Sequence, residues 1–166
     1  MKLKFIVAAS AVALTALSSQ AATTSWGAHA PLEIGVGGLA APGALFDTFS
    51  FSLGAQSSVT SGVVSFGNII GAAYSLYSFG TDGILGTSDD VAKGAWTFGA
   101  LPATHTVSLS AGSYYYTVMG GSFAPAGYAI ASSAVAAPVP EPETYALLAA
   151  GLGVIGFVVS RRRRES

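Results

Sequence analysis

The chain contains no cysteine, and its middle part has almost no positive charge. Without thiols it forms no disulfide, so its stability depends on packing or on a bound partner. Thiolate zinc sites, thiol catalysis and cysteine-linked haem are excluded for the same reason. Lys93 is the one lysine or arginine of residues 22–137, against five carboxylates, so this part carries a net charge of about −4. Nucleic acid and anionic lipid are therefore poor partners for it.

The N-terminal end has the pattern of a secretory signal peptide. Two lysines precede an apolar run over residues 5–17, and small residues then occupy the two positions that a signal peptidase reads. We expect residues 1–21 to be removed by signal peptidase, between Ala21 and Ala22. An uncleaved anchor is the alternative, but the apolar run is short for a membrane span.

The C-terminal end begins with a proline-rich segment and continues as an apolar one. Residues 138–144 hold three prolines, each of which fixes φ and removes a backbone donor, so we expect an extended spacer outside any helix or strand. Residues 145–160 are apolar on every side, which predicts a transmembrane helix with Thr144 as its N-cap. Such a helix would measure about 26 Å, slightly less than the roughly 30 Å of hydrocarbon in a bilayer.

Residues 161–166 form a basic tail. It begins with four arginines, which cannot enter lipid and by the positive-inside rule hold this end in the cytoplasm. Everything before Pro138 is then expected outside the membrane. The residues that anchor this topology are Arg161, Arg162, Arg163 and Arg164.

The tripeptide Pro140-Glu141-Pro142 (the PEP tripeptide), the apolar helix and the terminal arginines resemble the PEP-CTERM sorting signal of Gram-negative bacteria. The resemblance implies an inner-membrane precursor that an exosortase, a membrane-embedded cysteine protease-like enzyme, recognises and cleaves at the tripeptide. It also implies a final place at the cell surface or in the extracellular matrix, in systems that accompany exopolysaccharide and biofilm. The alternative is an ordinary single-pass anchor behind a proline-rich linker.

Between the two ends, apolar residues alternate with small polar residues over eight short runs separated by turn residues. Period-two alternation is typical of half-buried antiparallel strands, and eight runs in residues 22–137 predict an all-β domain, a single β-sandwich or jelly roll. The eight runs are residues 32–36, 49–53, 62–66, 73–79, 96–98, 105–109, 114–119 and 128–130.

Two of these runs resemble the FxDxF type of PEP-CTERM protein. Residues 45–53 resemble its early strand, although Leu45 stands where the first Phe would be, and residues 109–116 resemble its late, tyrosine-rich hairpin. We expect Asp47 to cap a turn at the start of its strand rather than to act in catalysis, because no acid or base partner accompanies it.

The segment from residue 81 to residue 90 contains Asp82, Asp89 and Asp90 among glycines and hydroxyl residues. Carboxylate oxygens are ligands that calcium prefers, so this segment is the candidate calcium site and calcium the only candidate cofactor. The spacing does not fit an EF-hand, because Gly83 directly follows Asp82 and no Glu closes the loop. The alternative is a solvated turn beside a sheet edge.

Catalytic motifs are missing from the sequence. Neither His29 nor His105 lies in a nucleophile or zinc-protease motif, so we expect no enzymatic activity. The aromatic residues suggest a sugar-binding platform if they are exposed and a core if they are buried. They are Trp26, Trp96, Tyr114, Tyr115 and Tyr116.

Three functions follow from these observations. The favoured one is a non-enzymatic surface or matrix protein, processed by signal peptidase and exosortase and associated with exopolysaccharide. The second is a carbohydrate- or calcium-binding surface module. The least favoured is an envelope enzyme, which would need a cleft with converging titratable groups.

Overall fold

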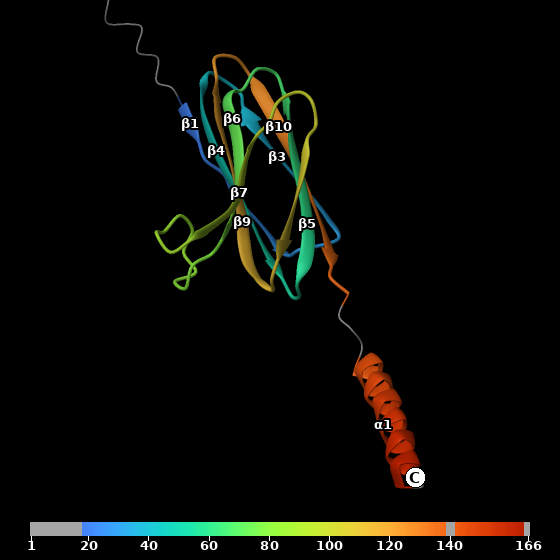
Figure 1. Cartoon of the computed structure of the whole chain (residues 1–166). Helices are drawn as coiled ribbons and strands as arrows, with labels where there is room; N and C mark the ends of the chain where they lie inside the picture. The colour runs from blue at the N-terminus through green and yellow to red at the C-terminus, as the bar shows by residue number, and fades with distance from the viewer. Residues whose placement is uncertain (1–17, 139–141, 165–166) are drawn as a thin grey trace, which may run out of the picture. The chain divides into compact units, whose positions relative to one another are not determined.

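The computed structural model describes residues 18–138 and 142–164. The chain divides into two compact units, Met1–Ala136 and Ala137–Ser166. The first contains strands β1 to β10, and the second contains the helix α1, Pro142–Arg164 (Figure 1). Most of the expected signal peptide, residues 1–17, lies outside the described residues, and so do Pro140 and Glu141 of the PEP tripeptide.

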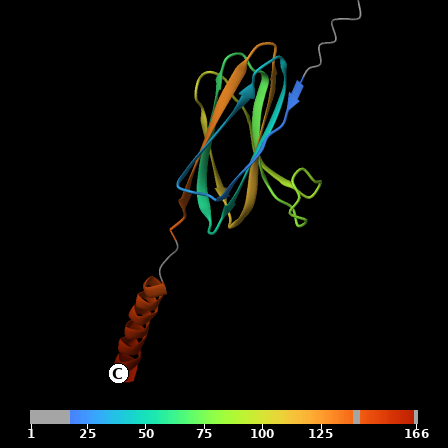
Figure 2. The ribbon, with the colours of Figure 1, turned by 180° about the vertical axis from the view of Figure 1, so that it is seen from behind.

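The first unit is a sandwich of two sheets, which Figure 2 shows from behind. One sheet (sheet A) has the strand order β4-β9-β6-β7, with β1 and β2 both paired to β4; the other (sheet B) has the order β3-β10-β5-β8. The strands are β1 Ser18–Gln20, β2 Thr23–Ala28, β3 Leu32–Leu39, β4 Gly43–Leu53, β5 Ser57–Phe66, β6 Ile70–Ser78, β7 Val91–Thr97, β8 Thr104–Leu109, β9 Gly112–Ser122 and β10 Ala126–Ala136.

Strands β3 to β10 have the topology of a jelly roll, with four strands in each sheet and antiparallel pairing throughout. Each of the eight runs expected from the sequence overlaps one of these strands, so the all-β sandwich prediction is confirmed. Strands β1 and β2 were not expected. They pair with β4 in parallel, and β2 has a single large apolar residue, Trp26, which is too weak a pattern to predict a strand.

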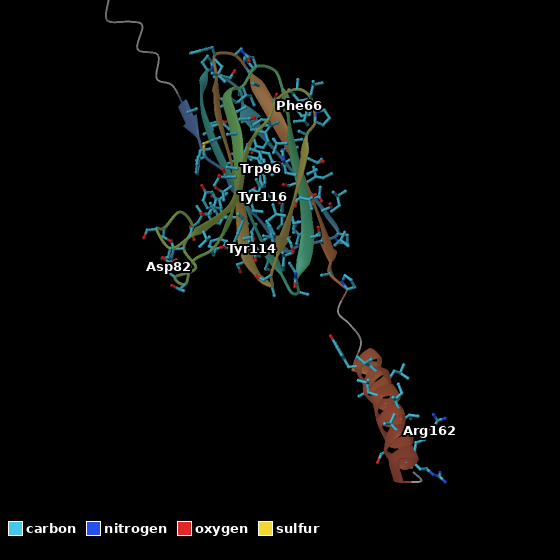
Figure 3. The ribbon with its side chains drawn as sticks, in the orientation of Figure 1. Phe66, Asp82, Trp96, Tyr114, Tyr116 and Arg162 are labelled. Atoms are coloured by element: carbon cyan, nitrogen blue, oxygen red, sulfur yellow. The ribbon has the colours of Figure 1, made fainter. Side chains whose placement is uncertain are left out.

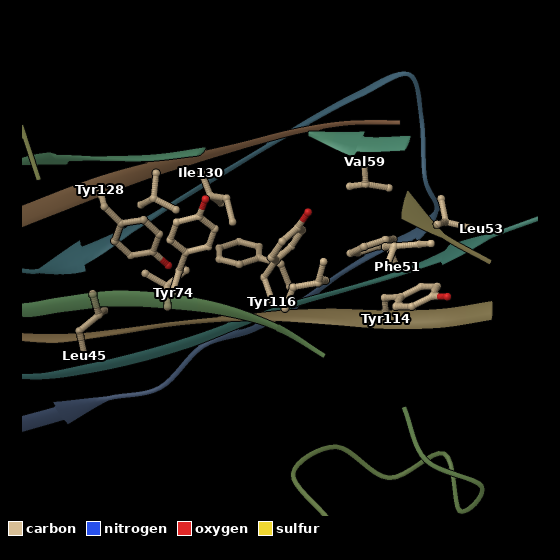
Figure 4. Packing of buried hydrophobic residues seen from close by; sticks show 14 of the residues in the cluster. Leu45, Phe51, Leu53, Val59, Tyr74, Tyr114, Tyr116, Tyr128 and Ile130 are labelled. Atoms are coloured by element: carbon tan, nitrogen blue, oxygen red, sulfur yellow. The ribbon is translucent and has the colours of Figure 1, made fainter. Parts of the chain in front are cut away.

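The core lies between the sheets and is rich in aromatic rings. Alternate residues of β4 and β9 face it, which is why Phe49, Phe51 and Leu53 are buried as expected. Phe51 stacks between Tyr114 and Tyr116 of β9, with ring centroids 5.7 and 5.4 Å away. Figure 4 shows these rings filling the space between the two layers.

Three buried tyrosines join the two sheets through their hydroxyl groups, and we call them the bridging tyrosines. Tyr74 of sheet A donates to the carbonyl oxygen of Ser61 in sheet B at 3.2 Å. Tyr116 of sheet A shares a hydrogen bond with Ser132 Oγ in sheet B at 3.1 Å. In the opposite direction, Tyr128 of sheet B donates to a carboxylate in sheet A. The hydroxyl group of each bridging tyrosine thereby has a hydrogen-bond partner, as a polar group in an apolar core requires.

The acceptor of the Tyr128 hydrogen bond is Asp47, and its position corrects the expectation from the sequence. Asp47 lies in the middle of β4 and only 4% of it is exposed. It caps no turn at the start of the strand, because β4 begins at Gly43, four residues before Asp47. Gly37 of β3 lies opposite, and a Cβ there would overlap both Asp47 Oδ2 and the Tyr128 ring. This glycine therefore makes room for the pair.

The second unit is the helix α1, and its start also differs from the expectation. It begins at Pro142, so the prediction that Thr144 is the N-cap is wrong, and Pro142 belongs to the helix rather than to the extended spacer. Proline fits the first helical position because its φ is helical and its missing N–H has no partner there in any case. The helix includes Arg161 to Arg164, and its 23 residues measure about 35 Å.

Candidate functional site

The helix α1 provides the hydrophobic segment of the tail. Its stretch Tyr145–Arg162 has a mean hydropathy of 1.4, and by length and composition it can cross a membrane. Large apolar side chains occur all round it, and every one that is described is exposed in this unit. Such a helix needs lipid or another protein around it.

The two histidines serve packing in the sandwich. His29 Nε2 lies 2.9 Å from Ser132 Oγ, a distance that a catalytic base and its nucleophile would also have. Ser132 is fully buried, however, and its hydroxyl also forms a hydrogen bond with Tyr116. The Ser132 hydroxyl is therefore taken up by two partners within the fold. His105 stacks on Trp96 with ring centroids 4.9 Å apart. Figure 3 labels Trp96, Tyr114 and Tyr116 among the side chains of the sandwich.

The acidic segment forms a loop between β6 and β7, and Figure 3 shows Asp82 on it, away from the two layers. Its carboxylates accept bonds from the loop's own backbone. Asp89 Oδ2 accepts from the N–H of Thr81 at 2.6 Å, and Asp90 accepts from the N–H groups of Gly80 and Gly86 at 2.7 and 2.8 Å. The two carboxylates therefore hold the loop closed.

These bonds favour the ionised carboxylates. The hydrogen bond from the Thr87 hydroxyl, followed by the backbone donors, lowers the pKa of Asp89 to about 2. The hydroxyl of Tyr115 is the largest cause that lowers the pKa of Asp90, and it donates at 2.7 Å. Burial first, and Asp90 second, raise the pKa of Tyr115 to about 12. Both carboxylates thus remain acceptors under mildly acidic conditions.

The calcium prediction stays a prediction. Among the described residues no group of three or more His, Asp or Glu side chains converges as a metal site would require. One feature does gather oxygens: Thr87 Oγ1 faces Asp82 Oδ1 at 3.3 Å, the carbonyl of Ile84 at 3.1 Å and Asp89 Oδ1 at 2.6 Å. One hydroxyl has a single proton, so it satisfies one of these three acceptors at a time.

A small pocket lies where this loop meets the outer face of sheet A, with a volume of about 240 Å³. We call it the Thr117 pocket. Phe46, Tyr77 and Met119 line it with apolar surface, and Asp90 adds a carboxylate from the loop. Thr117 of β9 also lines it, is 5% exposed, and has a buried hydroxyl without a hydrogen-bond partner in the described part of the chain. Orphaned buried hydroxyls are rare and call for a partner such as a ligand or water.

Of the two alternatives that the sequence left for its five aromatic residues, a sugar-binding platform and a core, the structure agrees with the core for most of them. Tyr114 and Tyr116 face the core, while Trp26 and Trp96 pack against it, partly buried. Tyr115 faces the opposite way and contributes to the Thr117 pocket, stacked on Tyr77 with centroids 5.3 Å apart. Sequence reasoning missed Phe46 and Thr117, because alternation identifies a strand's two faces but not the loop that folds over one of them.

The outer face of sheet B holds a second, wider groove of about 370 Å³. Leu32, Ile34, Ala129, Ala131 and Val64 line it with apolar atoms, and none of the residues that line it carries a charge. Leu32 and Ile34 are 57% and 63% exposed. An exposed apolar face of this kind is typical of a contact surface. The polar residues that line it are uncharged serines and threonines.

The fold and the tail together define a jelly-roll domain followed by a hydrophobic C-terminal sorting segment. Residues 138–164 match the family model described as the PEP-CTERM protein-sorting motif, which confirms that part of the resemblance. This motif supports an exported protein that is sorted by an exosortase, and the apolar helix fits a membrane-anchored precursor. The FxDxF subtype stays a prediction.

No curated protein matches the sequence. Among solved structures, the sandwich is similar to the pre-peptidase C-terminal domain of a collagenase from Bacillus anthracis, with a TM-score of 0.50, 13% identity, and coverage of 67% of this chain and 94% of that one. A second match is PliG of Aeromonas hydrophila, a periplasmic lysozyme inhibitor of g-type lysozyme, with a TM-score of 0.42, 16% identity, and coverage of 71% and 100%. At these identities the first likeness concerns the fold alone.

Proposed function

We propose that this chain is a non-catalytic protein of the cell surface or extracellular matrix whose sandwich binds a neutral exopolysaccharide at the Thr117 pocket. The observation that carries the proposal is the orphaned, buried hydroxyl of Thr117 beside aromatic and carboxylate groups. Sugars present apolar ring faces and hydroxyl groups together, and this pocket offers both kinds of partner.

The composition of the pocket favours a neutral sugar unit. Tyr77 and Phe46 provide aromatic surface, while the unpartnered Thr117 hydroxyl provides a hydrogen-bonding group for a sugar hydroxyl. The lone lysine of residues 22–137 leaves little to attract an anionic polymer. At about 240 Å³ the pocket is below the roughly 300–1,000 Å³ of drug-sized sites, so it suits one ring of a chain or a side branch.

The non-catalytic part of the proposal rests on burial. The pair of His29 and Ser132 resembles a base and its nucleophile, but Ser132 is fully buried and is occupied by Tyr116. The Thr117 pocket contains one carboxylate and no histidine, so it lacks the acid and base pair that glycoside hydrolysis needs.

The test is a glycan array of neutral oligosaccharides probed with the chain from Ala22 to Ser166 in detergent micelles. Thr117→Val keeps the shape and removes the hydroxyl. We expect it to weaken binding about tenfold, because one hydrogen bond contributes on the order of 1.4 kcal/mol. We also expect its Tm to stay the same or rise, because an unpaired buried hydroxyl is costly.

The matched control is Thr60→Val on the outer face of sheet B, where Thr60 and Thr106 hydroxyls pair at 2.8 Å far from this pocket in the fold. It should leave glycan binding unchanged. Equal binding by Thr117→Val and the unaltered chain would contradict the proposal, as would a glycan array without any bound neutral oligosaccharide.

Calcium binding by the loop between β6 and β7 is a second proposal. The oxygens of Asp82, Ile84 and Asp89 that converge on the Thr87 hydroxyl favour it, since calcium takes carboxylate, carbonyl and hydroxyl oxygens. Millimolar calcium should raise the Tm, and Asp89→Ala should abolish the rise. Identical melting curves with calcium and with a chelator would exclude this site.

A further inference from the structure

Asp47 is a buried carboxylate, and both of its hydrogen-bond donors among the described residues are uncharged groups. Its Oδ2 accepts from the Tyr128 hydroxyl at 2.6 Å, and its Oδ1 accepts from the backbone N–H of Ala22 at 2.9 Å. No ion pair to it occurs within the described residues, and Lys93 lies exposed on β7, at the opposite edge of sheet A from β1 and β2. A buried charge without a counter-charge destabilises a fold.

The backbone nitrogen of Ala22 is the atom that cleavage of the signal peptide would turn into a free amine. The sequence predicts that signal peptidase hydrolyses the bond between Ala21 and Ala22. Water then adds its hydroxyl to the carbonyl carbon of Ala21 and a hydrogen to the nitrogen of Ala22. The new amine takes up a proton from solvent, because α-amino groups titrate near pH 8, at about 7.7–8.0. Cleavage thus places a positive charge on the atom that already bonds Asp47.

We propose that Asp47 is the binding site for the α-ammonium group of Ala22, so that removal of the signal peptide gives the sandwich an ion pair, between this buried carboxylate and its own N-terminus, that the precursor lacks. The inference rests on the export that is part of the proposed function, and it adds a structural consequence of that export. The folded domain would distinguish a correctly cleaved N-terminus from an uncleaved or miscut one.

The surrounding contacts hold the ammonium in place after cleavage. The carbonyl oxygen of Ala22 accepts from the N–H of Thr48 at 2.8 Å, and β2 then pairs with β4 from Thr23 opposite Thr48 onward. These bonds lie after the cleaved bond, so they remain in the mature chain. The short strand β1, which ends at Gln20, leaves with the signal peptide.

The room for this pair is provided by neighbouring residues. Gly37 has no Cβ where one would overlap Asp47, and the Tyr128 hydroxyl fixes the second carboxylate oxygen. One oxygen of Asp47 therefore remains aimed at the nitrogen of Ala22. An ammonium group there makes a charge-assisted bond, which is shorter and stronger than the bond of a neutral amide.

The experiment compares three forms of the chain in detergent micelles. The first begins at a free Ala22, released by a protease that leaves no extra residue. The second is the same chain with an acetyl group on Ala22, which keeps one N–H and removes the charge. The third begins at Ser18 and has an ordinary peptide bond before Ala22. Each form is made with Asp47 and with Asp47→Asn, and its Tm is measured at pH 6.5.

We expect the free form to melt at least about 4 °C above the acetylated and extended forms. In the Asp47→Asn background this difference should vanish. The substitution itself should lower the Tm of the free form and leave unchanged or raise that of the acetylated form, because there it removes an unpaired buried charge. Asp82→Asn, which removes an exposed carboxylate, is the control and should preserve the full difference.

Equal Tm values of the free and acetylated forms with Asp47 intact would overturn the ammonium site. The cleavage position is tested separately, by sequencing the N-terminus of the protein isolated from cells, where Ala22 is the expected first residue. A different first residue would overturn the processing step, whatever the melting temperatures show. Glycan binding enters neither measurement, so failure of the Thr117 pocket is distinguishable from both.

Discussion

Replacing Tyr128 with Phe removes one hydroxyl from the middle of the sandwich and leaves the ring in place. Tyr128 and Asp47 are 1% and 4% exposed, and 2.6 Å separate their oxygens. Hydrogen bonds to charged groups contribute about 1.5–3 kcal/mol, and the carboxylate keeps its desolvation cost when a donor is lost. We expect the free energy of unfolding to fall by about 3 kcal/mol, which lowers the Tm by roughly 12 °C for a domain of this size.

The assay is thermal unfolding followed by the fluorescence of Trp26 and Trp96, which pack against the core. Tyr116→Phe is the matched control, because Ser132 keeps His29 as a partner at 2.9 Å when Tyr116 loses its hydroxyl. This control should lower the free energy of unfolding by about 1 kcal/mol and the Tm by roughly 4 °C. If Tyr128→Phe costs no more than Tyr116→Phe, the hydrogen bond between Tyr128 and Asp47 is weaker than the reasoning requires.

Three further predictions concern other parts of the chain. Burial is the largest cause that raises the pKa of each bridging tyrosine above its usual value of about 10. The stability that these protonated tyrosines give the fold is therefore complete below about pH 10 and is lost as the pH rises beyond it. A Tm that stays constant to pH 12 would contradict this. Gly37→Ala should cost about 3 kcal/mol by overlap with Asp47, while Gly54→Ala, with no neighbour within 4 Å, should cost almost nothing in urea unfolding. Alanines in place of the PEP tripeptide should leave a membrane-bound precursor on immunoblots of cell fractions; normal maturation of this variant would argue against exosortase processing.

The jelly roll was predictable because alternation of apolar and polar residues marks most of its strands. In β3 the alternation points to the wrong face: Leu32, Ile34 and Val36 are exposed. Gly35 between them is buried and lies against Phe49 and Ile130 of the core. Strand β2 escaped prediction because it is a polar strand that joins the edge of sheet A and buries little beyond Trp26. Its pairing with β4 is set by backbone bonds, which leave no mark in the side-chain pattern.

The candidate sites were harder to predict than the fold. Asp47 looked like a cap because an aspartate before an aromatic strand usually bonds its own turn, and its partners Ala22 and Tyr128 are 25 and 81 residues away. The Thr117 pocket depends on a loop that folds over the outer face of sheet A, which no local pattern encodes. The sorting tail could be predicted from the sequence alone, because a segment that crosses lipid needs a certain length, a high hydropathy and a positive charge at its cytoplasmic end, and all three lie within one stretch of sequence.

Mass spectrometry of both ends of the protein recovered from the cell surface or the medium tests the central claim most directly. Processing by signal peptidase and exosortase predicts a chain that begins at Ala22, ends at the PEP tripeptide and lacks the stretch Tyr145–Arg162. A surface protein that still carries residues 1–21 or the helix through Arg164 would contradict the account.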